Sequence, residues 1–174
     1  MLFFTDPQRT PDPAAAAARL PAGSGVVYRS FGAGDAEVVA ARLRTVARER
    51  DLVLLVGADA RLAARVGADG VHLPERLAHR AARLKAAYPR WLVTAAAHSL
   101  RAARVAGPDA VVVSAIFPSR SASAGAPMGP IRLASLTRAA GRPVYALGGV
   151  TTENARRLRP TGVIGIAAVD ALTR

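Results

Sequence analysis

The stretch Gly67-Ala-Asp-Gly-Val-His72 contains the pattern that decides the fold. A glycine stands two or three residues before a short apolar run, and the arrangement returns at Gly107-Pro-Asp-Ala-Val-Val112 and Gly162-Val-Ile-Gly-Ile-Ala167. Glycine readily adopts the left-handed conformation that ends a helix, and the apolar residues after it favour a buried strand. Each copy therefore predicts a junction where a helix ends and a strand of a parallel sheet begins.

The whole chain alternates between such apolar runs and segments rich in alanine and arginine. The predicted strands are Leu2–Thr5, Gly25–Arg29, Leu52–Val56, Gly70–Leu73, Leu92–Ala95, Ala110–Ser114, Val144–Leu147 and Val163–Ala167. Apolar residues recur at helical spacing in Ala36–Glu49, Ala58–Val66, Glu75–Tyr88, Leu100–Ala106 and Ile131–Ala140. Eight strands alternating with helices predict an α/β fold, the (β/α)8 barrel of triosephosphate isomerase type.

The length of 174 residues predicts a single domain, residues 1–174, and makes the barrel compact. Such barrels typically take about 250 residues, so we expect shortened terminal helices. The first strand begins at the start of the chain, and only residues 170–174 follow the last. Apolar outer surface left uncovered predicts a homo-oligomer. A doubly wound open sheet with fewer strands is the alternative fold.

The composition narrows the classes of function. The formal net charge is +12, but the chain has only eight aromatic residues among its 174, and basic residues scattered over helices favour anionic small molecules over nucleic acid. Cysteine is absent, which excludes disulfides and thiolate chemistry. Neither a signal peptide nor an apolar run of membrane-spanning length is found, so we expect a soluble, cytoplasmic protein.

The loops that follow the strands form the functional end of a parallel barrel. Gly148-Gly149 follows the predicted seventh strand, where backbone N–H groups can cradle a phosphate. An equally good interpretation is a tight turn in which Thr151 or Thr152 caps the next helix with Glu153 as partner. Residues 114–130, SAIFPSRSASAGAPMGP, form a loop long enough to be a binding loop or a disordered tether.

Histidine is the side chain best suited to proton transfer near neutral pH. His98 lies just beyond the predicted fifth strand, where it can serve as a general base, or simply belong to a helix-capping stretch. His72 ends an apolar strand and is expected to be a core residue, and His79 is expected on a helix surface. The spacing of the three histidines does not indicate a zinc site.

Five motifs follow one another between Leu52 and Leu172. They are Gly67-Ala-Asp-Gly-Val-His-Leu73, Ala97-His-Ser-Leu100, Ile116-Phe-Pro-Ser119, Pro143-Val-Tyr-Ala-Leu-Gly-Gly-Val150 and Gly162-Val-Ile-Gly-Ile-Ala-Ala168. In this order they resemble the thiamine phosphate synthase and thiazole tautomerase (TenI) family. The resemblance implies a barrel that binds a thiazole phosphate at the loops after strands seven and eight. It also implies that residues 114–130 close over the site.

The chain departs from the synthase members of that family. A synthase joins a pyrimidine pyrophosphate to the thiazole phosphate, and needs cationic groups and Mg²⁺ for the departing pyrophosphate. The family's Gln-x-Arg-x-Lys after strand two reads Val27, Arg29 and Phe31, so only the arginine is kept. The family's Asn-Asp after strand three reads Gly57 and Ala58.

Two further synthase positions differ. A Mg²⁺-binding aspartate falls at Leu77, which leaves Glu75 as the nearby carboxylate. The loop pattern Thr-x-Thr-Lys reads Ser119-Arg120-Ser121-Ala122, so the lysine is missing and Arg120 is its partial substitute. We therefore expect no metal and no cofactor, with Mg²⁺ required only if the chain is a synthase after all.

Thiazole tautomerisation requires fewer groups than the synthase reaction. It needs a phosphate cradle, a base and a cation for the substrate carboxylate. The resemblance implies His98 as the catalytic histidine and Arg29, or Arg120, as the carboxylate partner. The residues expected to bind substrate and phosphate are Ser119, Arg120, Ser121, Gly148, Gly149, Ala168 and Val169. Asp170 stands where the family has serine, and its charge would weaken anion binding unless it points away.

The sequence thus predicts a protein of thiamine biosynthesis that binds a phosphorylated thiazole and resembles the tautomerase more than the synthase. Two alternatives stay open. The first is a divergent thiamine-phosphate synthase that uses Arg29, Arg120 and Glu75. The second is a non-catalytic barrel that binds a phosphate ligand without turnover.

Overall fold

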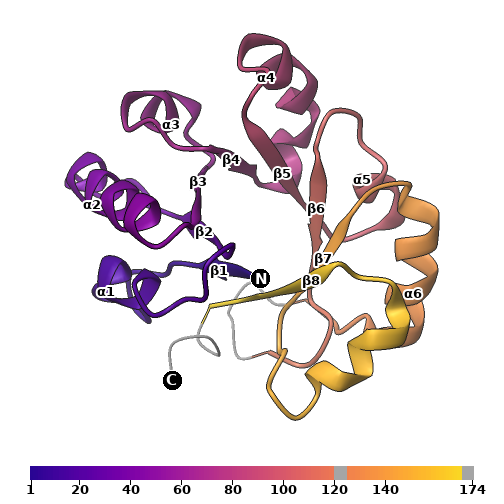
Figure 1. The fold of residues 1–174 in the computed structure, drawn as a ribbon. Coiled ribbons are helices and arrows are strands. Elements are labelled where there is room, and N and C mark those ends of the chain that lie inside the picture. Colours follow the sequence, from indigo (N-terminus) through magenta and orange to yellow (C-terminus); the bar gives the residue numbers. More distant parts are fainter. Residues whose placement is uncertain (120–124, 170–174) are drawn as a thin grey trace.

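The computed structural model describes residues 1–119 and 125–169, and its eight parallel strands close into one barrel in sequence order (Figure 1). The strands are β1 (Leu2–Phe4), β2 (Gly25–Tyr28), β3 (Val53–Gly57), β4 (Gly70–Leu73), β5 (Leu92–Ala97), β6 (Ala110–Val113), β7 (Val144–Leu147) and β8 (Gly165–Ala168). Closure is made by β1 against β8, where Leu2 pairs with Ala167. The predicted barrel is confirmed, and the open-sheet alternative is wrong.

The strand predictions differ from the structure mainly at the ends. β4 and β7 have the predicted bounds, whereas β5 continues to Ala97 and β8 begins at Gly165. Val163 lies before β8 because the chain there is still leaving the turn at Gly162, whose φ is +78°. The pattern of apolar residues therefore locates strands but does not resolve where the hydrogen-bonded ladder begins.

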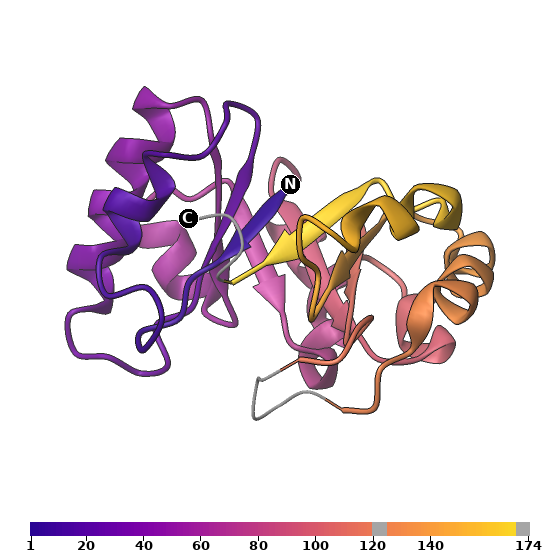
Figure 2. The same ribbon diagram turned by 90° about the horizontal axis from the view of Figure 1, so that it is seen from below.

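The helices form a ring outside the strands. They are α1 (Pro13–Ala17), α2 (Ala36–Glu49), α3 (Ala60–Arg65), the 3₁₀ helix η1 (Glu75–Arg80), α4 (Ala81–Ala87), α5 (Leu100–Ala103), α6 (Gly129–Ala140) and the 3₁₀ helix η2 (Ala155–Thr161). In Figure 2 the indigo and purple helices α1 and α2 lie on one side of the barrel and the orange α6 lies on the opposite side. The bounds of α2 are as predicted, while α1 and η2 were not predicted from the sequence.

The repeated glycine motif leads into a strand at all three copies: Gly67, Gly107 and Gly162 have positive φ, and β4, β6 and β8 begin three residues later. Two of the copies also contain an aspartate. The backbone N–H groups of Asp69 and Asp109 donate to the second residue of the preceding strand. The acceptors are Leu54 O at 2.9 Å and Val93 O at 2.7 Å. Their carboxylates accept the N–H of the same residues, at 2.8 and 2.7 Å. Each aspartate thus clamps the start of one strand to the junction that leads into the next.

Packing inside the barrel uses side chains from alternate strand positions. The interior cluster contains Leu2, Phe4, Val27, Leu55, Val112 and Ala167, all of them buried. Two larger clusters lie between the strands and the helix ring. Within residues 1–119 and 125–169, no helix is long and apolar enough to cross a membrane.

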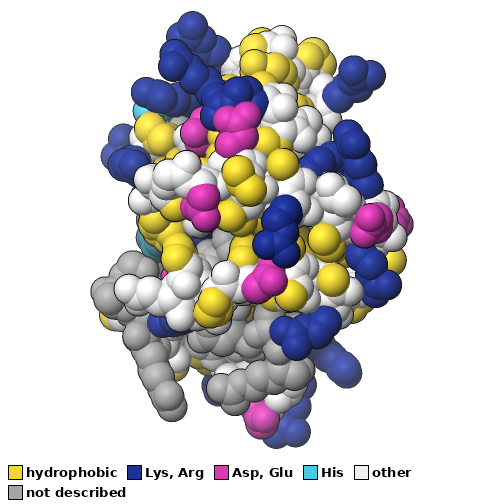
Figure 3. All heavy atoms as spheres, turned by 90° about the vertical axis from the view of Figure 1, so that its left-hand side faces the viewer, with side chains coloured by type: hydrophobic (Ala, Val, Ile, Leu, Met, Phe, Trp, Pro, Cys, Tyr) yellow, Lys and Arg dark blue, Asp and Glu magenta, His cyan; other side chains and the backbone are white. Residues whose placement is uncertain are grey.

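Charged side chains of both signs lie on the face of the molecule seen in Figure 3. On the face seen in Figure 3, the Lys and Arg side chains are spread out and separated by acidic and hydrophobic ones. Such a surface has no continuous basic stripe on that face of the kind that follows a nucleic-acid backbone.

Candidate functional site

The interior layer nearest the carboxyl ends of the strands contains a neutral histidine. His72 on β4 is 7% exposed, and its Nδ1 is hydrogen-bonded to Thr94 Oγ1 at 2.9 Å. Its ring meets the edge of Phe4, with 4.9 Å between centroids. Burial, with a smaller contribution from the nearby Arg29 charge, lowers the pKa of His72 to about 3. His72 is therefore a core residue, as its apolar strand predicts.

Arg29 follows β2 directly and is held in one orientation at the mouth of the barrel. Its Nε donates to the carbonyl oxygen of Thr5 at 2.8 Å, and an Nη lies 3.4 Å from Asp6 Oδ2. The guanidinium lies near two aromatic rings, 5.6 Å from the Phe4 centroid and 5.1 Å from the Phe31 centroid. Burial lowers the pKa of Arg29, but an arginine stays charged in proteins. The mouth therefore contains an oriented cation that is still partly open to a ligand.

His98 follows β5 directly and is paired with Glu75 of η1. Glu75 Oε2 accepts hydrogen bonds from the His98 backbone N–H and from Nδ1, both at 2.7 Å. A carboxylate can only accept, so this bond places the proton on Nδ1 of a neutral ring and leaves Nε2 as a free acceptor. Ser99, rather than His98, caps α5 by accepting from Ala102 N–H at 3.2 Å. The arrangement is that of a general base oriented by a carboxylate.

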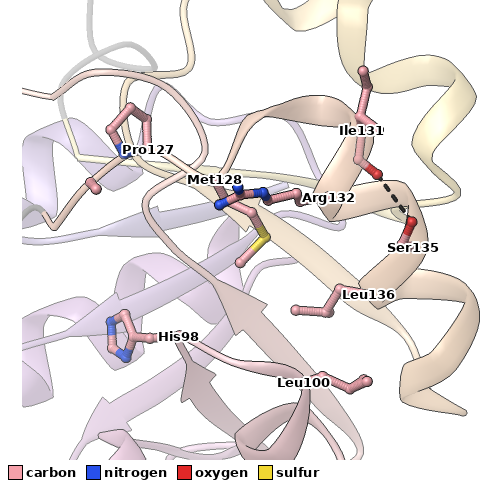
Figure 4. A pocket seen from close by; sticks show the side chains of 9 residues that line it. His98, Leu100, Pro127, Met128, Ile131, Arg132, Ser135 and Leu136 are labelled. Atoms are coloured by element: carbon pink, nitrogen blue, oxygen red, sulfur yellow. Dashed lines mark hydrogen bonds between the residues drawn. The ribbon is translucent and has the colours of Figure 1, made fainter.

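The His98 side chain is 56% exposed and is one of the residues that line a groove beside α5 and the start of α6 (Figure 4). The groove has a volume of about 450 Å³, and Leu100, Met128 and Arg132 are among the side chains that line it. A second hollow of about 350 Å³ lies on the Glu75 side of the pair. The histidine and its carboxylate thus separate two hollows that a small ligand can enter.

The predicted phosphate cradle after β7 is a tight turn with two left-handed glycines. Gly148 and Gly149 have φ values of +95° and +64°. Thr151 N–H donates to Asn154 Oδ1 at 2.8 Å, and Asn154 N–H lies 3.4 Å from Thr151 Oγ1. The alternative interpretation named Glu153 as the capping partner, but Asn154 has that role. Glu153 is instead bound by the Thr151 and Thr152 hydroxyls, and they lower its pKa to about 2.

The first part of the long loop lies directly on this turn. Phe117 N–H donates to Gly148 O at 3.0 Å, and Ile116 N–H donates to Leu147 O at 3.1 Å. A β carbon at Gly149 would overlap the carbonyl oxygens of Phe117 and Pro118 at far less than contact distance. Only glycine fits at position 149, because the loop and the turn pack backbone against backbone.

The remaining predicted binding residues fall near this turn or outside the described residues. Ser119 continues the loop that covers Gly149. Ala168 ends β8, and Val169 packs against the interior cluster of the barrel. Arg120, Ser121 and Asp170 lie outside the described residues.

The acidic side chains described at the mouth already have partners. Asp6 and Glu75, the acidic residues closest to the mouth of β1 and β4, are each paired with a cation or histidine, Arg29 and His98. Within residues 1–119 and 125–169, no three metal-ligating side chains come together. Mg²⁺ is usually bound through one or two carboxylates together with waters and substrate phosphates, so at Asp6 or Glu75 it would compete with Arg29 or His98.

Two features of this end were not predicted from the sequence. The hydrogen bond between Glu75 and His98 joins residues that are 23 positions apart in the sequence. The two residues come together because β4 pairs with β5. Phe31 adopts a left-handed backbone, with φ of +50°, beside Arg29. An aromatic residue directly before the glycine-rich segment Gly32-Ala33-Gly34 was the available sign in the sequence.

Comparison with known proteins gives a consistent result. The model of the family described as thiamine monophosphate synthase matches residues 1–172. A thiamine-phosphate synthase of Thiobacillus denitrificans is 36% identical over 137 residues, which are 76% of this chain and 65% of the relative. That of Alcanivorax borkumensis is 33% identical over 179 residues, 97% of this chain and 82% of the relative.

A solved structure is similar over almost the whole barrel. The thiamine phosphate pyrophosphorylase of Pyrococcus furiosus superposes with a TM-score of 0.84 at 26% sequence identity. The superposition covers 99% of this chain and 87% of that structure.

Proposed function

This chain belongs to the thiamine monophosphate synthase family, and we propose that it binds a phosphorylated thiazole at the carboxyl end of its barrel and catalyses a proton transfer on it. The reaction is a tautomerisation: a proton leaves one position of the thiazole carboxylate and another proton adds elsewhere on the same molecule. The sum of atoms and charges is unchanged, so neither a metal nor a co-substrate is required.

The observation that supports this reaction is the pairing of His98 with Glu75. The bond from Nδ1 to the carboxylate orients the ring and stabilises the imidazolium that forms when Nε2 takes a proton. His98 also lines a groove of about 450 Å³, a volume within the range of small-molecule sites.

The substrate's negative groups have partners on the same end of the barrel. Arg29 is an oriented guanidinium suited to a carboxylate. The turn at Gly148 and Gly149 is proposed to hold the phosphate, because left-handed glycines turn backbone N–H groups toward a common point. The negative charge of Glu153 next to this turn favours a phosphate held by Gly148 rather than one placed over Thr152.

A second candidate is the condensation named in the comparisons. The curated relatives and the similar solved structure are named thiamine-phosphate synthase or pyrophosphorylase, and these names favour a reaction between a pyrimidine pyrophosphate and the thiazole phosphate. The paired state of Asp6 and Glu75 weighs against it, since pyrophosphate release in such a reaction calls for strong electrostatic stabilisation.

The two reactions are separated by one set of assays on the purified protein. Isomerisation of carboxythiazole phosphate is followed by solvent proton exchange in NMR spectra, and thiamine phosphate formation is followed with both substrates and Mg²⁺. We expect isomerisation, reduced at least 100-fold in kcat by His98→Ala and less by Glu75→Gln. His79→Ala is the matched control, because it removes a histidine on η1 while leaving the pair intact, and its kcat should be unchanged.

Two outcomes contradict the proposal. Full isomerisation by the His98→Ala variant would show that another group is the base. Thiamine phosphate formation that depends on Mg²⁺, without isomerisation, would establish the synthase in its place.

A further inference from the structure

Phe31 combines two features that are unfavourable for folding. Its φ is +50°, in the left-handed region that bulky side chains rarely adopt. Its side chain is also 68% exposed to solvent. A strained backbone with an exposed aromatic ring stabilises neither the core nor the turn, so a functional reason for this residue is indicated.

The surroundings of Phe31 do not require an aromatic residue. The turn is closed by the bond from Ala33 N–H to Ser30 O at 3.0 Å, in which the Phe31 side chain takes no part. A β carbon placed at Gly32 or Gly34 would meet no atom within 4 Å. There is therefore open space around Gly32 and Gly34 at the tip of the loop after β2.

The contact that Phe31 does make is with the cation of the mouth. Its ring centroid lies 5.1 Å from Arg29 Cζ, and the Phe4 centroid lies 5.6 Å from the same atom. Phe4 is buried, so its ring supports the guanidinium from within the barrel. Phe31 contributes a ring that is still largely open, next to a charge that is held by Thr5 and Asp6.

We propose that Phe31 is a specificity-determining residue whose ring stacks on a planar aromatic ring of the substrate, while the adjacent Arg29 pairs with the anionic group that ring bears. This inference rests on the proposed function for the identity of the substrate. It adds that the site selects for an aromatic ring, and not merely for a phosphate. Offset stacking of two rings stabilises a complex beyond the area it buries.

Calorimetric titration of the whole chain with three probes tests the inference. The probes are carboxythiazole phosphate, benzyl phosphate as an unrelated aromatic phosphate, and inorganic phosphate. We expect Phe31→Ala to weaken binding of both aromatic probes about 10-fold and to leave inorganic phosphate unchanged. Phe31→Tyr should bind them as the unaltered chain does. Ile164→Ala, which shortens another exposed apolar side chain at the opposite end of the barrel, is the matched control and should bind like the unaltered chain.

Thermal unfolding of Phe31→Gly gives a readout that a structural role would not produce. Glycine adopts φ of +50° without strain, so the variant should unfold about 2 °C higher while losing the same affinity for aromatic probes as Phe31→Ala. A lower Tm together with unchanged affinity would show that Phe31 only supports the turn, and would overturn the inference.

The probes distinguish failure of this inference from failure of the proposed function. If the unaltered chain binds benzyl phosphate but not the thiazole, and Phe31→Ala loses the former, the role of Phe31 holds and the proposed substrate is wrong. If both aromatic probes bind Phe31→Ala as tightly as the unaltered chain, the role of Phe31 is wrong and the substrate stands. If neither aromatic probe binds more tightly than inorganic phosphate, the inference is overturned.

Discussion

The amino ends and the carboxyl ends of the same eight strands use charged side chains in opposite ways. At the amino ends, Asp69 accepts from Leu54 N–H and from Arg44, and Asp109 accepts from Val93 N–H and from Lys85. At the carboxyl ends, Arg29 and His98 are each held through some of their donors while the rest of the side chain faces the open mouth or groove.

This difference shows how a short chain separates stability from function. The carboxylates of the amino end satisfy strand N–H groups that would otherwise lack a partner, so they stabilise the barrel. The pairs at the carboxyl end orient Arg29 and His98 and leave them partly exposed, which is what the proposed binding and proton transfer need. Ile164 takes the position of the aspartate in the third copy of the repeat, where it keeps the backbone bond to Val144 O at 2.9 Å but offers no side-chain acceptor.

The largest expected effect is the loss of one amino-end carboxylate. Asp109→Ala leaves Val93 N–H without its acceptor and removes the carboxylate from Lys85, which keeps only its bond to Trp91 O, and should lower the free energy of unfolding by about 2 to 3 kcal/mol. Urea unfolding measures the change. Asp109→Asn, which keeps one acceptor oxygen, should lose less than the alanine variant. Equal free energies of unfolding for the unaltered chain and both variants would show that the Asp109 carboxylate does not stabilise the barrel.

The carboxyl end should make stability depend on pH through His72. Its pKa is about 3 in the folded protein and about 6.5 when unfolded. The unfolded chain therefore takes up the proton first as the pH falls. The stabilisation is complete above pH 6.5 and is lost progressively toward pH 3. Between pH 8 and pH 5 the loss amounts to about 2 kcal/mol.

The measurement is urea unfolding at several pH values, with His72→Asn as the comparison. The variant cannot be protonated in this range, so its stability should fall less steeply below pH 6.5. Parallel pH profiles for the two proteins would contradict the neutral, buried state of His72.

The smallest expected effect adds the missing carboxylate to the third copy of the repeat. Ile164→Asp supplies an acceptor for Val144 N–H and removes an exposed apolar side chain, so it should raise the free energy of unfolding by about 1 kcal/mol. Ile164→Ala is the control that removes the apolar surface without adding an acceptor. A decrease on introducing the aspartate would show that the third junction is not equivalent to the first two.

Much of the site's placement could be predicted from the sequence, but little of its geometry. The positions of Arg29, His98 and Gly149 after strands follow from the alternation of apolar runs, because every parallel strand delivers its last residues to the same end. The bond between Glu75 and His98 could not be predicted, since it depends on where η1 passes over β5. The orientation of Phe31 over Arg29 depends on one backbone angle, and periodicity contains no information about it.

Local sequence patterns are sufficient to predict the barrel of this chain. The spacing of apolar residues and the glycines before the strands each span about ten residues or fewer, and the same pattern recurs at successive junctions. Contacts between segments far apart in the sequence cannot be predicted from such local patterns. The close approach of Phe117 and Pro118 to Gly149, and the burial that keeps His72 neutral, arise only when eight strands close into a ring. Closure also brings the ends of all eight strands to one mouth, where Arg29 is held by Thr5 and Asp6 and His98 is held by Glu75.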